Sequence, residues 1–167
     1  MISQDLIFDS HIYKYISMAS HSDQSDIQFM KMAIELGKQV QGYTGDNPYV
    51  GAIVVKDGIV IGKGQTLAPG KGHAEALATQ DAESNGFSVA DSTVYSTVEP
   101  CSFFGRTPSC ASMLVEKCVR RVVIGIRDPH PLVNGAGIQI LRSSNIEVTE
   151  GICAAEVKEY LVPWLLR

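Results

Sequence analysis

Four residues with clear chemical potential lie in two short stretches of this sequence. The stretch HAE holds His73 and Glu75, and the stretch TVEPCSFFGRTPSC holds Cys101 and Cys110. One neutral imidazole and two thiolates suit Zn²⁺ and leave a fourth tetrahedral position for water. A zinc ion lowers the pKa of a bound water toward ~7. Glu75, two residues after His73, is placed to carry a proton rather than to act as a fourth ligand.

Simpler explanations exist for each of these residues. Two cysteines can form a disulfide, act in catalysis or fill a core, and a His-x-Glu at a helix start is usually a solvated helix end. The other two cysteines, Cys118 and Cys153, are predicted to be core residues. The combination of HAE with two cysteines near a strand-to-helix junction favours the zinc interpretation.

The bulk composition describes an ordinary globular chain. Its 167 residues fit one domain, with 45% hydrophobic and 19% charged residues. The net charge of -4 disfavours a nucleic-acid partner, because such affinity rests on basic surface. No apolar run approaches the ~18 to 20 residues of a membrane span, and the N-terminus lacks the basic start and apolar region of a signal peptide. We therefore expect a cytoplasmic protein with reduced thiols and no membrane partner.

Apolar periodicity becomes regular from residue 26 onward. Residues 1–25 are predicted to be an extension with a short helix around Ile12–Met18, and Asp26 to be the N-cap of the first full helix. A hairpin is expected at Asp57-Gly58. The remaining elements are predicted from their periodicity: helices at 73–86, 107–118, 135–145 and 154–167, and strands at 92–99, 120–126 and 146–151.

The order of these elements predicts an α/β layered domain with a largely parallel portion after the hairpin. Sites in such sheets form where strand ends meet helix starts. His73 and Cys101 both fall at such junctions, and Cys110 falls in the first turn of a helix that Thr107 and Pro108 are expected to open. The positive helix N-termini favour thiolates there. In the last helix the apolar stripe of Val157, Leu161, Trp164 and Leu165 is predicted to be a docking face, and Pro163 is expected to interrupt or bend the helix.

Several longer stretches together resemble a known family. HAE and EPC match two parts of the zinc-deaminase signature, although the second cysteine follows after eight residues rather than two. The deaminase domain of the bifunctional riboflavin-biosynthesis deaminase/reductase (RibD-like) is similar in four stretches over residues 26–152: NPYVGAIVVKDG, HAEALA, TVEPCSFFGRTPSC and RDPHPLVNGAGIQIL. The resemblance implies a three-layer α/β/α cytidine-deaminase-like fold with a central mixed five-stranded sheet. It also implies one bound zinc, hydrolytic loss of ammonia from an aminopyrimidine, and a homo-oligomer (dimer or tetramer). On this view residues 1–25 are an extension, residues 26–152 the deaminase domain and residues 153–167 a C-terminal helical segment, with no reductase domain.

The resemblance also implies which side chains contact the substrate. These are Asn47, Thr66, Ala74, Glu99, Phe103, Arg106, Asp128 and His130. Three of them depart from the family pattern: Phe103 and Thr66 stand where the family has histidines, and His130 where it commonly has asparagine. In the family these positions recognise the phosphoribosyl part of the substrate. Arg106 keeps a guanidinium that can form two hydrogen bonds with a phosphate.

Four functions are therefore compared. The first is the riboflavin-pathway aminopyrimidine deaminase. A second is a RibD-like deaminase with an altered substrate, such as another pyrimidine, a purine or a pterin. A third, a deaminase that edits nucleic acid, is disfavoured by the acidic charge and the eight-residue cysteine gap. The fourth, a catalytically silent zinc-stabilised domain, is disfavoured by Glu75, since purely structural zinc sites usually carry four protein ligands.

Overall fold

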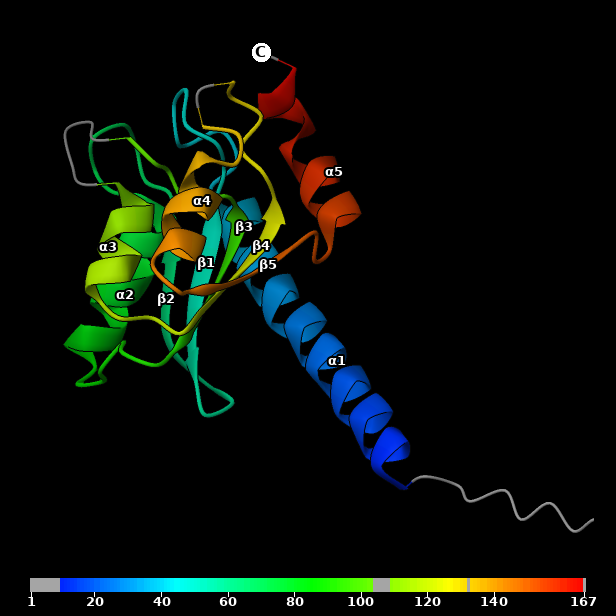
Figure 1. The fold of residues 1–167 in the computed structure, drawn as a ribbon. Coiled ribbons are helices and arrows are strands. Elements are labelled where there is room, and N and C mark those ends of the chain that lie inside the picture. The colour runs from blue at the N-terminus through cyan, green and yellow to red at the C-terminus, as the bar shows by residue number, and fades with distance from the viewer. Residues whose placement is uncertain (1–9, 104–108, 132, 167) are drawn as a thin grey trace, which may run out of the picture.

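Helices and strands alternate along the chain around one five-stranded sheet (Figure 1). The structure is a computed structural model that describes residues 10–103, 109–131 and 133–166, with side chains from residue 23. The helices are α1 Ser10–Gln39, α2 Ala74–Ser84, α3 Cys110–Glu116, α4 Ala136–Ser143 and α5 Ala154–Leu165. The strands are β1 Gly51–Lys56, β2 Ile59–Gln65, β3 Thr93–Val98, β4 Arg121–Ile126 and β5 Glu147–Glu150.

The sheet is mixed and has the order β2-β1-β3-β4-β5. Strand β1 runs antiparallel to both β2 and β3, whereas β3, β4 and β5 are parallel to one another. Asp57 and Gly58 join β1 to β2 with φ angles of 50° and 76°, the left-handed pair that a tight hairpin needs. The predicted α/β fold with a hairpin followed by parallel strands is confirmed.

Helices cover both faces of this sheet, so the central strands are buried. Helices α2, α3 and α4 lie on one side and α1 and α5 on the other (Figure 1). All six residues of β3 are buried, as are the last five of β4. Such burial explains why β4 is a nearly continuous apolar run rather than an alternating pattern, whereas β3 also buries Thr93, Ser96 and Thr97. None of the helices in the described part of the chain is long and apolar enough to cross a membrane.

Helix α2 packs unusually close to β2 because β2 carries two glycines on that side. A Cβ at Gly62 would lie 2.2 Å from the carbonyl oxygen of Ala78, and one at Gly64 would lie 2.2 Å from that of Ala74. Any side chain there would push α2 away from the sheet. The two glycines therefore set how close the start of α2, where His73 and Glu75 lie, comes to the sheet.

The first helix is longer than predicted, and Asp26 is not its N-cap. Helix α1 begins at Ser10 and runs without interruption through Asp26. Asp26 is only 2% exposed, and its carboxylate accepts hydrogen bonds from Arg121 and from the hydroxyl of Tyr95. The carboxylate of Asp26 therefore joins α1 to strands β3 and β4 and does not cap a helix end. Figure 1 shows the N-terminal half of α1 extending away from the sheet, so that half needs no apolar face toward the core.

Three further predictions about local structure were wrong. Ser109 is the N-cap of α3, and its hydroxyl accepts from the N–H of Ser112; Thr107 and Pro108, predicted to open this helix, lie outside the described residues. Helix α5 continues past Pro163 to Leu165, so of the two expected effects the interruption does not occur. Cys118 is exposed rather than in the core, because it follows the end of α3 with a φ of 55°. Cys153 is half-buried and packs against the core.

The predicted apolar stripe of α5 splits between core and surface. Val157 and Leu161 are fully buried, whereas Leu165 is exposed. Tyr160 is also buried, and its hydroxyl lies 2.8 Å from the carbonyl oxygen of Tyr49 and 2.9 Å from Oγ1 of Thr97. Burial raises the pKa of Tyr160 to about 12, so this hydroxyl stays protonated. The inner part of the stripe therefore packs α5 against this chain's own core.

Candidate active site

The structure brings His73, Cys101 and Cys110 together at one point. His73 precedes α2 with extended backbone angles, Cys101 follows the end of β3, and Cys110 is the first residue of α3. Nδ1 of His73 lies 3.5 Å from Sγ of Cys101 and 3.4 Å from Sγ of Cys110. All three ligand atoms lie within 4.8 Å of one another.

These separations fit a tetrahedral zinc ion. Zn–N and Zn–S bonds of ~2.1 and ~2.3 Å at tetrahedral angles place nitrogen and sulfur ~3.6 Å apart. The observed distances of 3.4 and 3.5 Å are close to this value. The hydrogen bond with Cys110 lowers the pKa of the Cys101 thiol to about 4, and that bond also raises the pKa of Cys110. Without a cation, the negative charge of one thiolate disfavours deprotonation of the other thiol. A cation between the two sulfurs stabilises both as thiolates.

The start of α3 is also hydrogen-bonded to Cys101. The N–H of Cys110 donates to Sγ of Cys101 over 3.2 Å, and the N–H of Ala111 donates to the carbonyl of Cys101 over 3.1 Å. The start of α3 therefore presents one backbone N–H to the sulfur of Cys101, which favours its thiolate form.

Glu75 lies beside this cluster and is buried. Its side chain is 4% exposed, and Oε1 lies 3.0 Å from the hydroxyl of Ser96. Burial raises the pKa of Glu75 above its ordinary value. A carboxylate with a raised pKa is a better proton acceptor than an ordinary one, which suits a residue that transfers protons. Ser96 had no signal in the sequence, because it occupies an ordinary position of a buried strand.

A cavity of about 400 Å³ opens beside these residues. Five of the predicted substrate contacts line it: Asn47, Thr66, Glu99, Phe103 and Asp128. The cavity is also lined by six residues that were not predicted as site residues: Pro48, Val50, Pro69, Gly70, Gly72 and Val98. Most of these belong to connecting segments, which have no periodic pattern that could reveal them.

The other predicted contacts are placed differently. Ala74 is fully buried and His130 exposed, and neither is among the described lining residues of the cavity. Arg106 lies outside the described residues. Thr66 is 3% exposed, and its hydroxyl accepts a hydrogen bond from the N–H of Val50, so this side chain also holds the cavity wall.

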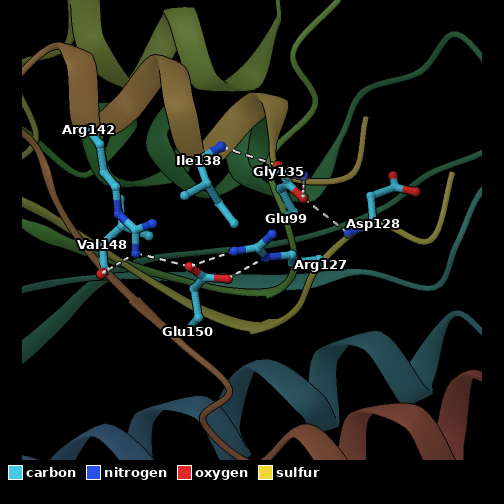
Figure 2. A network of polar contacts seen from close by, with 8 residues as sticks. All are labelled: Glu99, Arg127, Asp128, Gly135, Ile138, Arg142, Val148 and Glu150. Atoms are coloured by element: carbon cyan, nitrogen blue, oxygen red, sulfur yellow. Dashed lines mark hydrogen bonds and ion pairs between the residues drawn. The ribbon is translucent and has the colours of Figure 1, made fainter. Parts of the chain in front are cut away.

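Glu99 and Asp128 are the acidic residues on the wall besides Glu75. Both oxygens of Glu99 accept backbone hydrogen bonds, from the N–H groups of Asp128, Gly135 and Ile138 (Figure 2). Asp128 is half-buried, and this burial raises the pKa of its carboxyl.

Comparison with known proteins agrees with this geometry. The family described as "Cytidine and deoxycytidylate deaminase zinc-binding region" matches residues 23–126. A protein of Buchnera aphidicola named diaminohydroxyphosphoribosylamino-pyrimidine deaminase is 41% identical over 136 residues, which cover 81% of this chain and 90% of that protein. The riboflavin biosynthesis protein RibD of Aquifex aeolicus is 43% identical over 134 residues, which cover 80% of this chain but only 37% of the relative.

A solved structure extends the likeness to three dimensions. The diaminohydroxyphosphoribosylaminopyrimidine deaminase/5-amino-6-(5-phosphoribosylamino)uracil reductase of Thermotoga maritima superposes with a TM-score of 0.83 at 41% identity. The superposition covers 87% of this chain and 41% of that one, so the chain spans about two fifths of this longer relative. The family match over residues 23–126 and the relatives at about 40% identity show that the chain belongs to the zinc-binding cytidine and deoxycytidylate deaminase family.

Proposed function

We propose that this protein deaminates the diaminohydroxyphosphoribosylaminopyrimidine of riboflavin biosynthesis. The observation that carries the proposal is the convergence of His73, Cys101 and Cys110 on one point, at a cavity that His73, Cys101 and the buried Glu75 line. The relative in Buchnera aphidicola, most of whose length this chain covers, is named for that activity.

The roles of the residues follow from their chemistry. His73, Cys101 and Cys110 would hold the zinc, which supplies Lewis acidity and lowers the pKa of a water at the open position. Glu75 takes one proton from the attacking water and delivers it to the ring nitrogen as the new C–O bond forms. It then takes the remaining proton of that hydroxyl group and delivers it to the amino group, which leaves as ammonia as the C–N bond breaks and the ring carbonyl forms. Ser96 holds the Glu75 carboxyl in place through its hydroxyl. Burial raises the pKa of Glu75, which makes its carboxylate a better proton acceptor.

The cavity wall supplies orientation. Asn47 and Asp128 present an amide and a carboxylate that can bond the N–H and C=O groups of a planar heterocycle. Phe103 is 56% exposed and offers an apolar face at the cavity for stacking on a flat ring.

A second candidate is a deaminase of the same kind with an unphosphorylated substrate. The described lining residues include three carboxylates and no lysine or arginine. A phosphate there would meet a negative surface, unless Arg106 supplies the positive charge. The described part of the cavity therefore favours a neutral or cationic aminoheterocycle.

Ammonia release separates these candidates. We expect turnover of aminopyrimidines and compare kcat/KM for the phosphoribosylated compound, its dephosphorylated form, and simple aminated pyrimidines, purines and pterins. A strong preference for the phosphorylated compound that Arg106→Ala abolishes supports the riboflavin-pathway substrate. Equal or better turnover of the dephosphorylated form supports the second candidate. No ammonia from any compound refutes both.

We also infer a cytoplasmic homo-oligomer, a dimer or a tetramer. The inference is supported by four cysteines without a disulfide and by exposed apolar side chains on α1, Ile27 and Met32. Light scattering on the purified protein tests the oligomer, and a monomer at micromolar concentration contradicts it.

A further inference from the structure

Glu99 anchors the segment between β4 and α4 through three backbone hydrogen bonds (Figure 2). Its side chain is 3% exposed. Oε2 accepts from the N–H of Gly135 over 2.9 Å and of Asp128 over 3.3 Å, and Oε1 accepts from the N–H of Ile138 over 3.2 Å. Two of these donors belong to the N-terminal end of α4, where the helix dipole favours an anion. Bonds to an ionised carboxylate are the stronger kind, so this anchor is firm.

The anchored segment carries the wall residue Asp128. Oδ1 of Asp128 accepts from the N–H of His130 over 2.8 Å, and within the described part of the chain Oδ2 has no hydrogen bond. Asp128 therefore keeps an acceptor for a substrate N–H or O–H group. Its backbone position, in contrast, is set by Glu99.

Residues 99–101 connect the anchored segment to the proposed metal ligands. Glu99, Pro100 and Cys101 are consecutive. A Cβ at Gly137 would lie 2.0 Å from the carbonyl oxygen of Pro100, so only glycine lets α4 lie directly on this peptide. The position of α4 is thus fixed one residue from the ligand Cys101.

We propose that Glu99 is a positioning residue that holds Asp128 at a fixed place relative to the zinc ligands, and that Asp128 makes the substrate contact. This inference rests on the proposed function. The resemblance suggested that Glu99 itself contacts substrate. However, both of its oxygens already accept backbone N–H groups, whereas Asp128 has an oxygen left for a ligand.

The opposite side of the segment offers a matched control. Arg127, the neighbour of Asp128, pairs with Glu150 through Nε–Oε2 and Nη2–Oε1 distances of 2.6 and 3.3 Å (Figure 2). Glu150 also accepts from Arg142. Both arginine side chains are about half exposed, so this ion pair is solvated and weak. Glu150→Gln removes the same charge as Glu99→Gln but leaves the three backbone bonds intact.

The test is a set of kinetic measurements on the zinc-loaded protein with the phosphoribosylated diaminopyrimidine. Glu99→Gln puts an amide donor against at least one backbone N–H, which frees the segment. We expect KM to rise about 10-fold or more, with kcat changed less than about threefold and zinc retained. Asp128→Ala should raise KM similarly. Adding Glu99→Gln to Asp128→Ala should raise it no further, because Glu99 acts through Asp128. Glu150→Gln should leave KM within about twofold.

Three outcomes overturn the proposal. If the KM increases of the two single variants multiply in the double variant, Glu99 contacts the substrate itself. An equal KM rise in Glu150→Gln means that any loosening of the segment suffices. Loss of zinc or stability in Glu99→Gln without a change in KM means that Glu99 only supports the fold.

Amide hydrogen exchange tests the anchor without any activity. In the unmodified protein the amides of Asp128, Gly135 and Ile138 should exchange slowly, and in Glu99→Gln faster, while those of β3 and α2 stay unchanged. Fast exchange of the three amides in the unmodified protein overturns the proposal even where Glu99→Gln fails to fold. If no aminopyrimidine is turned over, the proposed function fails, and the exchange result still decides whether the anchor exists.

Discussion

Replacing Asp26 by alanine should be one of the most destabilising single changes in this protein. Asp26 is 2% exposed and lies at the centre of a buried polar cluster. Its Oδ1 accepts from Nη1 of Arg121 over 2.9 Å and from the hydroxyl of Tyr95 over 2.8 Å, and its Oδ2 accepts from Nη2 of Arg121 over 2.7 Å. Asp26→Ala therefore leaves a guanidinium and a buried hydroxyl without their main partner.

The expected magnitude separates two interpretations of this residue. An N-cap, as the sequence suggested, would cost about 1 kcal/mol when replaced by alanine. Breaking a buried ion pair on one side costs about 3 to 5 kcal/mol, because the remaining charge stays desolvated. Arg121 keeps contacts to Glu147 and Thr149, which places the expected loss at the lower end, about 3 kcal/mol. In a domain of this size that corresponds to a fall in Tm of roughly 6 to 12 °C.

Urea unfolding at a fixed protein concentration measures this loss, and Asp23→Ala is the matched control. Asp23 is an exposed carboxylate one turn earlier on the same helix, and its replacement should change the free energy of unfolding by less than about 0.5 kcal/mol. The double variant Asp26→Ala with Tyr95→Phe should lose less than the sum of the single losses, since the two groups are partners. A loss of about 1 kcal/mol or less would refute the buried-pair argument.

Three further changes test the site and its surroundings. Cys101→Ser with Cys110→Ser should abolish stoichiometric zinc in the purified protein, and full occupancy by elemental analysis would contradict the ligand assignment. Glu75→Gln should keep zinc but lower kcat by ~10² or more, and an active variant would move the proton transfer elsewhere. The pKa of Glu150 is lowered, chiefly by its hydrogen bond from Arg127, so its contribution to stability is present above its unfolded pKa and lost as pH falls through the lower folded value. The stability difference between the wild type and Glu150→Gln should therefore shrink from pH 6 to pH 3 in urea titrations, and a constant difference would count against this linkage.

The grouping of His73, Cys101 and Cys110 could be predicted from the sequence because each of these residues lies beside a local signal. His73 and Cys101 flank predicted elements, and parallel strands bring their carboxyl ends to one edge of a sheet. The hairpin at Asp57-Gly58 was equally local, since that dipeptide adopts the two left-handed conformations that the turn needs.

Other features depend on contacts that no local pattern encodes. Asp26 and Arg121 are 95 residues apart, so the local pattern around Asp26 fits a helix cap and does not reveal its buried partner. Pro163 was expected to interrupt or bend α5. It does not interrupt the helix, because it lies two residues before the helix end, where few backbone bonds remain to be lost. Cys118 is apolar by type but follows the end of α3 in a left-handed conformation, where the chain turns toward solvent.

Glu99 and Asp128 show how the two kinds of information combine. The resemblance assigned both residues to substrate, because a motif records that a residue type is required but not which atoms it bonds. In the structure the oxygens of Glu99 bond the backbone of the segment that presents Asp128, and α4, which follows this segment, lies on the peptide preceding Cys101. A glutamate directly before Pro-Cys can thus serve the reaction without touching the substrate. The same reasoning applies to Thr66 and Ser96, whose hydroxyls hold Val50 and Glu75 in place. Changes at such supporting positions should alter KM or kcat through the residue that they hold, and double-mutant cycles with that residue should be non-additive.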